Sequence, residues 1–385
     1  MRTFCFITLM IIPLVVFSQS KPTIYDKMIV FNYATIDTSD SDIQSIVKVW
    51  KNYLQNRLYG FVRKIDTAGY IYWNDEEKQL YNDPDLILAI DPFLSISQTS
   101  ILNIKPFLHG FFRIMNVKGF VDDSTGRFTT QAIYYILAKK VNDNFKLFNY
   151  FYLDKKKLIQ TKIRNVCYYY PSEYKFNKQN ALNFGNFEDS LSNLFNCPVP
   201  KEIIYLVDND KDTMLNHLGF MYYGGLGLGK HSGHFIVKEN MIISSSGENH
   251  RHELVHYFNH KKNPDVIGFF DEGLATYFGG NLGNPFQWHL NCINQYLKDK
   301  PDLDLTDETK FGYIDAKTNP QYVLGAIIIT YTIDQYGFAK ALTLLQYSKK
   351  QNNFPDVIEK ELGIKKSKLN AFFRNYLTKN ASNRN

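Results

Sequence analysis

Two histidines and a glutamate in the second half of the chain have the residue types and spacing of a metal site. His252-Glu253-Leu254-Val255-His256 is a complete His-Glu-x-x-His pattern. Residues four apart share one face of a helix and lie about one turn from each other. The imidazoles of His252 and His256 could therefore hold one zinc ion. Glu253 would lie beside that ion, where its carboxylate can accept a proton from a bound water.

The segment around this pattern has the start and stop signals of a helix. Ser245 and Glu248 have the spacing of a capping box, which predicts the N-cap at Ser245. Asn263-Pro264 predicts the end of the helix, because proline has no N–H to donate and disfavours a helical residue before it. The alternative is a charged helix with two solvated histidines, so the metal site needs support from other residues.

A third candidate ligand, Glu272, lies sixteen residues beyond His256. The chain between them can finish one helix, turn, and return on a second helix that Gly279-Gly280 ends. A carboxylate from the second helix would complete a zinc site of two histidines and one glutamate, with one position open for water. Taken alone, Glu272 would be interpreted as a surface carboxylate. Asp271 is a candidate to orient a zinc-bound imidazole.

The two segments together resemble a known family. His252-Glu253-x-x-His256 followed by Asp271-Glu272-Gly273 is similar to the gluzincin metallopeptidases of the peptidase MA clan. In that family a second helix gives the third zinc ligand, and the resemblance implies this role for Glu272. It also implies a thermolysin-like catalytic domain over residues 199–385, with a small sheet, the His-Glu-x-x-His helix and a mostly helical C-terminal lobe.

A later segment adds to the resemblance. Tyr322-Val323-Leu324-Gly325 is similar to the Tyr-x-x-Gly of gluzincin aminopeptidases, whose tyrosine stabilises the tetrahedral oxyanion, and this implies the same role for Tyr322. The alternative is a buried aromatic residue that begins a core helix. The chain has no Gly-Ala-Met-Glu-Asn-like motif, so aminopeptidase specificity is not implied. The metzincin pattern is excluded, because Asn259 and Lys262 stand where its glycine and third histidine belong.

Other histidines are weaker candidates. His250 lies two residues before the first histidine of the pattern, and we expect it to point elsewhere. His260 continues the row of residues four apart and is expected at the edge of the cleft. Three more could reach the cleft and assist Tyr322, although a surface or capping role is the alternative for each: His231, His234 and His289.

Residues 1–20 read as a secretory signal. Arg2 supplies the positive charge, and residues 4–17 are almost wholly apolar but too few to span a bilayer comfortably. We expect cleavage after Ser20 and a secreted or periplasmic protein with no stable membrane insertion once the signal is removed. An uncleaved anchor is the alternative.

Charge and cysteine content bear on the partners of the chain and on the sites that its cysteines could form. The formal net charge of +6 is small and no dense basic block is present beyond Lys155-Lys156-Lys157, which a solvated turn explains, so we expect no nucleic-acid partner. Three cysteines would remain after signal removal, an odd number at irregular spacing that predicts neither a disulfide framework nor a zinc knuckle. Cys167 and Cys197 could pair or could be separate buried thiols.

The predicted fold class is α+β in two domains. Residues 21–198 should form an N-terminal domain in which a helix over residues 40–58 precedes an antiparallel sheet, a layout similar to a nuclear-transport-factor-2-like cone. Asn142-Asp143-Asn144 predicts a hairpin turn in that sheet. Tyr168-Tyr169-Tyr170 is either a stacking platform or sheet packing. The glycine-rich segment 224–229 lacks the spacing of a nucleotide loop and is interpreted as a flexible loop between strands.

Together these observations predict an exported zinc peptidase that acts on peptides or proteins, with His252, His256 and Glu272 as ligands. Glu253 would be the general base and Tyr322 the oxyanion stabiliser. The edge strand expected at residues 233–237 would pair with an extended substrate. The rival function is an exported binding or surface-assembly protein with a structural or inactive zinc site. An intact Glu253 argues against the rival, because structural zinc sites usually fill all four positions with protein ligands.

Overall fold

The computed structural model describes residues 29–63, 70–74, 98–122, 124–224, 232–236, 240–307 and 312–381. The strands are Ile29–Phe31 (β1), Gln98–Pro106 (β2), Phe111–Val121 (β3), Phe128–Val141 (β4), Asn144–Asn149 (β5), Ile159–Ile163 (β6), Val166–Tyr170 (β7), Ile203–Val207 (β8), Phe220–Tyr223 (β9), Gly233–Ile236 (β10) and Met241–Ser244 (β11). The α-helices are Ser41–Arg63 (α2), Tyr150–Asp154 (α4), Lys178–Phe195 (α5), Lys211–His217 (α6), Arg251–Lys262 (α7), Gly268–Gly279 (α8), Phe286–Leu297 (α9), Pro320–Tyr336 (α10), Phe338–Leu345 (α11), Phe354–Leu362 (α12) and Lys366–Asn380 (α13). This mixture confirms the α+β class. The signal at residues 1–20, His231 and most of the glycine-rich loop lie outside the described residues.

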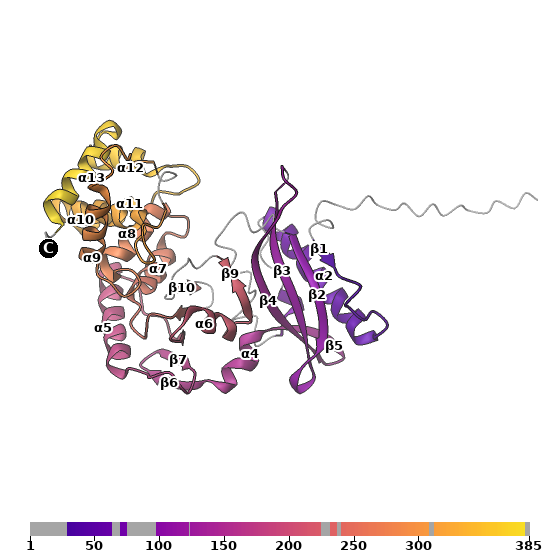
Figure 1. Cartoon of the computed structure of the whole chain (residues 1–385). Coiled ribbons are helices and arrows are strands. Elements are labelled where there is room, and N and C mark those ends of the chain that lie inside the picture. The colour runs from indigo at the N-terminus through magenta and orange to yellow at the C-terminus, as the bar shows by residue number, and fades with distance from the viewer. Residues whose placement is uncertain are drawn as a thin grey trace, which may run out of the picture.

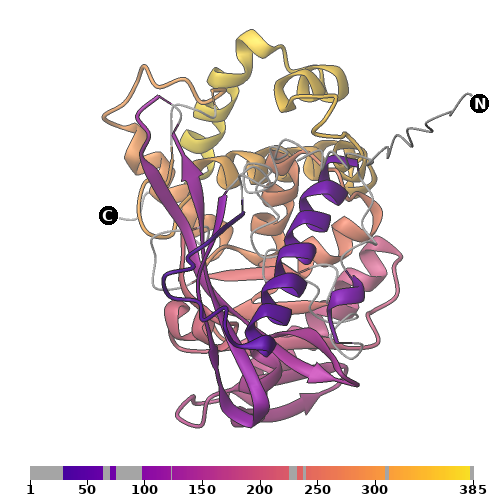
Figure 2. The ribbon, with the colours of Figure 1, turned by 90° about the vertical axis from the view of Figure 1, so that its right-hand side faces the viewer.

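The first sheet is built from long antiparallel strands with one helix across them (Figures 1 and 2). Its order is β1-β2-β3-β4-β5, and β9 also pairs with β4. The sheet is not wholly antiparallel as expected, because the short β1 pairs parallel with β2. The predicted hairpin turn is confirmed: Asn142 and Asp143 have φ of 48° and 62°, the left-handed conformation that a tight two-residue turn requires. Helix α2 is fixed on the sheet by apolar contacts and by Trp50, whose indole N–H donates to Asn116 at 2.9 Å.

The second sheet packs against the helix that carries the two candidate histidines, and its three parallel strands are almost wholly buried. Its order is β10-β11-β8-β7-β6, with β11, β8 and β7 parallel and the outer strands antiparallel to their neighbours. Side chains along β8 alternate between two cores, as the pleat of a strand requires. Ile204 and Leu206 pack into the core shared with the first sheet, whereas Tyr205 and Val207 pack into the core of the helical lobe. The sheet therefore joins the two halves of the molecule.

The boundary expected at residue 198 does not separate the two sheets. Strands β6 and β7 precede it in sequence and yet pair with β8 in the second sheet. Strand β9 follows it and yet pairs with β4 in the first sheet. Helix α5 also precedes the boundary and packs against the candidate metal helix α7. Hydrophobic patterns report that a segment is a strand, but they do not report its partner, which is chosen by contacts distant in sequence.

Two choices left open by the sequence are decided by the structure. Tyr168 is fully buried with its ring 4.8 Å from that of Tyr205, and Tyr170 is 8% exposed, so these rings pack the sheet and form no stacking platform. Cys167 and Cys197 are both free thiols.

Among the described residues, no helix is long and apolar enough to cross a membrane.

A partly buried histidine pairs with carboxylates that follow a strand of each sheet and should make stability depend on pH. His217, at the end of α6, lies 2.5 Å from Asp154 and 3.2 Å from Asp208, and Lys157 also pairs with Asp154. Burial lowers the pKa of His217, but the hydrogen bonds to both carboxylates outweigh burial and raise that pKa to about 9. The stabilisation is therefore complete below the ordinary histidine pKa of about 6.5 and is lost as pH rises through about 9.

We expect His217→Gln to lower the free energy of unfolding by about 1.5–3 kcal/mol at pH 6, the range for hydrogen bonds to charged groups. The deficit should shrink markedly at pH 9.5, because the parent histidine has then lost its charge. Urea unfolding of parent and variant at both pH values measures the difference. A deficit of the same size at pH 6 and 9.5 would contradict the charged pairing.

Candidate metal centre

Helix α7 begins later than the capping box predicts. It runs from Arg251 with His250 at the N-cap, whereas an N-cap at Ser245 was expected. Ser245 and Glu248 have tertiary partners in place of capping partners: the Ser245 hydroxyl bonds with the backbone of Ser232, and Glu248 accepts from the backbone N–H of Asn177 at 2.6 Å. Gly247, with φ of 93°, keeps the intervening chain out of helical conformation. The predicted end of the helix at Asn263 is confirmed.

His252 presents one ring nitrogen to the candidate metal position. Its Nδ1–H donates to the carbonyl of Gly280 at 2.7 Å, which leaves the Nε2 lone pair free for a ligand bond. This contact depends on a close approach of α7 and the end of α8. A Cβ on Gly279 would lie 2.4 Å from the His252 backbone nitrogen, so a larger residue would force the helices apart. Gly279 and Gly280 therefore end α8, and Gly279 also allows helix α7 to pack closely against that end.

His256 is oriented by a buried aspartate. Its Nδ1 lies 3.0 Å from Asp271, which directs Nε2 toward Glu272. Asp271 is 6% exposed and also receives hydrogen bonds from Asn259 at 2.6 Å and His260 at 2.7 Å. Asp271 therefore lies within ion-pairing distance of His256 Nδ1 and is itself held by Asn259 and His260. His260 extends the same network.

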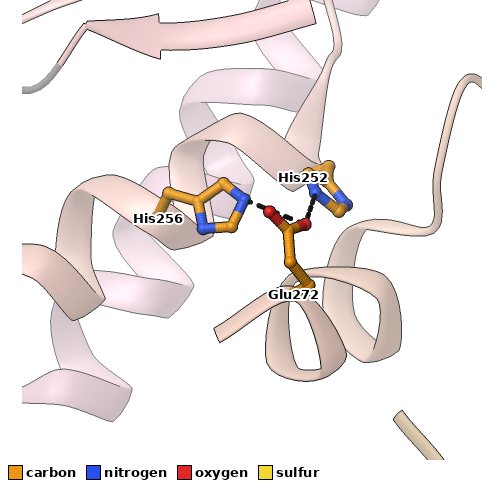
Figure 3. Close-up of side chains that lie close together, drawn as sticks. All are labelled: His252, His256 and Glu272. Carbon is orange, nitrogen blue, oxygen red and sulfur yellow. Dashed lines mark hydrogen bonds and ion pairs between the residues drawn. The ribbon is translucent and has the colours of Figure 1, made fainter. Parts of the chain in front are cut away.

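Glu272 completes the cluster from helix α8. Figure 3 shows the imidazoles of His252 and His256 projecting from α7 toward its carboxylate. Oε2 lies 3.1 Å from His252 Nε2 and 3.5 Å from His256 Nε2, and the three ligand atoms all lie within 4.8 Å of one another. A tetrahedral ion with bonds of about 2.0–2.1 Å separates its ligands by about 3.4 Å, so the observed spacing fits an ion of this size. The Glu272 side chain is 27% exposed, which leaves the cluster open to solvent on its side.

Charges in the cluster are strongly coupled. Burial raises the pKa of Glu272, but the neighbouring imidazoles, His256 foremost, outweigh burial and lower that pKa to about 2. For His256 the two effects have opposite signs. Burial lowers the pKa of His256, but the carboxylates of Asp271 and Glu272 outweigh burial and hold that pKa well above its ordinary value. Burial raises the pKa of Glu253, only partly offset by the two imidazoles. Such opposed shifts within one cluster are typical of functional sites.

A second group of possible ligands overlaps the first. His256, His260 and Asp271 also lie within 4.8 Å of one another. Both Asp271 oxygens are already hydrogen bonded there, and His256 has a single nitrogen on that side. We interpret this group as the support of His256 and the His252–His256–Glu272 group as the metal centre.

Tyr322 is brought to the cluster by a close crossing of two helices. A Cβ on Gly273 of α8 would lie 2.3 Å from Gly325 of α10, and a Cβ on Gly325 would lie 2.2 Å from the Phe269 carbonyl. These two glycines let the helices touch, so the glycine three residues after Tyr322 has a packing role. The Tyr322 ring stacks 6.0 Å from that of His252, and its hydroxyl donates to Glu272. Burial and the nearby Glu272 carboxylate raise the pKa of Tyr322 well above its ordinary value, so the phenol keeps its proton.

A cleft of about 740 Å³ leads to the cluster. Glu272 and Tyr322 are among its lining residues, together with the stacked rings of Phe269 and Phe354, which lie 4.0 Å apart. This volume is large enough for an amino-acid side chain of any size with part of its backbone. Glu272 is therefore the member of the three-residue cluster that borders this cleft.

The remaining histidines occupy different environments. His234, on β10, lies close enough to His256 that burial and this neighbour lower its pKa to about 4. His289 is fully buried and bonded to Thr318 and the Asn281 carbonyl, so it supports a loop and does not reach the cleft. His250 was expected to point away and instead packs beside Glu253, with Nε2 3.8 Å from Oε1.

Sequence reasoning also missed Tyr313, whose hydroxyl bonds with Tyr322. No motif marks Tyr313, and only the folded chain brings it to the site. The prediction for His250 considered only its offset of two residues from His252 and overlooked its offset of three residues from Glu253.

No protein-family model matches this chain, and no curated protein matches it.

Proposed function

We propose that the protein is a zinc-dependent peptidase of the gluzincin type. The observation that carries the proposal is the convergence of His252, His256 and Glu272 at ligand spacing, with Glu253 buried beside them. Two imidazoles and one carboxylate are the donor set of catalytic zinc sites that keep a position open. The solvent-facing side of Glu272 and the adjoining cleft support an open position over a closed structural site.

Each protein group has a distinct task in the proposed reaction. Zinc, when bound, would lower the pKa of a water toward ~7 and polarise the substrate carbonyl. Glu253 accepts a proton from the attacking water and later passes it to the leaving amine. Asp271 keeps the His256 ring in its ligand orientation. Tyr322 donates its phenolic hydrogen to the negative charge that develops on the carbonyl oxygen.

Proposed substrates are peptides or proteins outside the cytoplasm, because residues 1–20 read as a secretory signal. Strand β10 lies at the edge of the described second sheet and next to α7. An extended substrate would add to this edge through backbone hydrogen bonds, with a side chain entering the cleft.

Cleavage of a mixed peptide library by the full chain tests the function. Activity should disappear after treatment with a chelator and return when zinc is restored, with about one zinc bound per chain. Stoichiometric metal together with no cleavage of any peptide would favour the rival, an exported binding or surface-assembly protein with a structural or inactive zinc site.

Tyr322→Phe tests the oxyanion role. Removing one hydrogen-bond donor to a developing oxyanion lowers kcat by about 10²–10³-fold, and we expect a loss of this size. Zinc content should equal that of the parent, because the tyrosine is not a proposed ligand and phenylalanine preserves its ring packing. Steady-state kinetics and metal analysis of the same preparation check both statements. An unchanged kcat would leave Tyr322 as a packing residue only.

A further inference from the structure

His250 lies inside the protein beside the carboxylate of Glu253. It is 5% exposed, and its ring occupies space that Gly233 of β10 leaves free. A Cβ on Gly233 would stand 2.1 Å from the ring carbon Cε1, so the strand holds the ring in place. Nε2 lies 3.8 Å from Glu253 Oε1 and has no hydrogen-bond partner among the described residues. A buried polar atom without a partner is uncommon and calls for a physical explanation.

The contacts around the ring accommodate a proton on Nε2. Ser244 Oγ accepts the N–H of Ser246 at 3.0 Å and lies 3.0 Å from His250 Nδ1, to which its hydroxyl can donate. The Tyr205 hydroxyl donates to the Gly247 carbonyl and accepts the backbone N–H of His250. With Nδ1 accepting, a neutral ring carries its hydrogen on Nε2. The facing carboxylate favours the same tautomer, because it attracts an N–H and would repel a lone pair.

We propose that His250 is a positioning residue that donates its Nε2–H to Glu253 and so orients this carboxylate. The role rests on the proposed peptidase function, in which Glu253 is the general base. The backbone N–H of Phe235 also donates to this carboxylate. His250 would add a second donor, and a remaining lone pair would accept the proton of the attacking water.

The present separation is longer than a hydrogen bond, which ends near about 3.2 Å. A shift of roughly 1 Å in the Glu253 side chain would bring Oε1 within hydrogen-bond distance of His250 Nε2. Catalytic hydrogen bonds are often long without substrate and tighten in the reactive complex. The ring itself cannot approach much further, because Gly233 and Ser244 hold its other side.

Two substitutions of His250 distinguish loss of the Nε2–H donor from loss of the rest of the imidazole side chain. Glutamine places an amide N–H near the position of Nε2, whereas asparagine reaches only the position of Nδ1 and keeps the contact with Ser244. Asparagine is also a favourable N-cap residue, so His250→Asn should not weaken helix α7. We expect His250→Asn to lower kcat by about 10–100-fold, as loss of an outer-shell hydrogen bond does, with KM and zinc content within about twofold of the parent. His250→Gln should restore kcat to within about fivefold of the parent.

A second measurement does not depend on activity. In zinc-loaded protein with ¹⁵N-labelled histidine, the two-bond proton–nitrogen couplings of His250 should show a protonated Nε2, with His250→Gln identifying its signals. Parent-like activity in both variants, equal losses in both, or a proton on Nδ1 in an active parent would each overturn the positioning role and leave the peptidase function standing. A parent that cleaves nothing when zinc-loaded would overturn the peptidase function itself, and this role with it.

Discussion

Glu253→Gln is expected to abolish peptide hydrolysis while zinc stays bound. Glutamine keeps the size of the side chain but cannot accept a proton, and Glu253 is the residue proposed to take one from the attacking water. General acid–base catalysis contributes about 10²–10⁴-fold, so a loss near the upper end of this range would remove measurable turnover. The side chain is 6% exposed, which excludes bulk solvent as a substitute base at that position.

Metal analysis and thermal unfolding of the same Glu253→Gln preparation are the controls. Zinc content should match the parent, since His252, His256 and Glu272 are untouched. The melting temperature should not fall, because the buried carboxylate becomes a neutral amide. Peptidase rates equal to those of the parent would refute the general-base role.

Glu272→Ala is expected to lose zinc binding as well as activity. The substitution removes the only carboxylate that faces both imidazole Nε2 atoms in the described chain, at 3.1 and 3.5 Å. Loss of an outer-shell partner costs about 10–100-fold in metal affinity, so loss of a ligand should cost more than about 100-fold. Zinc titration against a competing chelator measures the affinity, and the peptide assay at saturating zinc measures what activity remains.

Asp271→Asn is the matched control on the same helix. It alters the support of His256 and leaves all three proposed ligands in place, so we expect a loss of about 10–100-fold in zinc affinity. The order parent, Asp271→Asn, Glu272→Ala in decreasing affinity is the expected result. Equal affinity in Glu272→Ala and the parent would remove Glu272 from the ligand set and with it the proposed open site.

Local sequence signals located the metal helix and the return helix, but not every boundary. The turn after Lys262 and the end of α8 at Gly279 follow from proline and glycine chemistry, which acts within a few residues. The start of α7 was misplaced because Ser245 and Glu248 have the spacing of a capping box but bond to distant backbone groups. A capping motif competes with tertiary partners, and the sequence contains no information on how close those partners come.

Strand pairing in the two sheets also depends on tertiary partners that the sequence does not report. The hairpin at Asn142-Asp143 could be predicted because a two-residue turn is local. The pairing of β7 with β8 and of β9 with β4 crosses the expected domain boundary. The partners of these strands are chosen by the burial of whole faces in two cores.

At the site, sequence alone determined that His252 and His256 share one helical face, because four residues make about one helical turn. It also provided candidates for the third ligand and for the support of His256, since their order along the chain suits two antiparallel helices. Only the tertiary structure decided that Glu272 lies at ligand distance and that Tyr322 reaches it, because both depend on close helix contacts through glycines. The placement of His250 beside Glu253 likewise depends on a strand, a serine and a glycine that converge only in the folded chain.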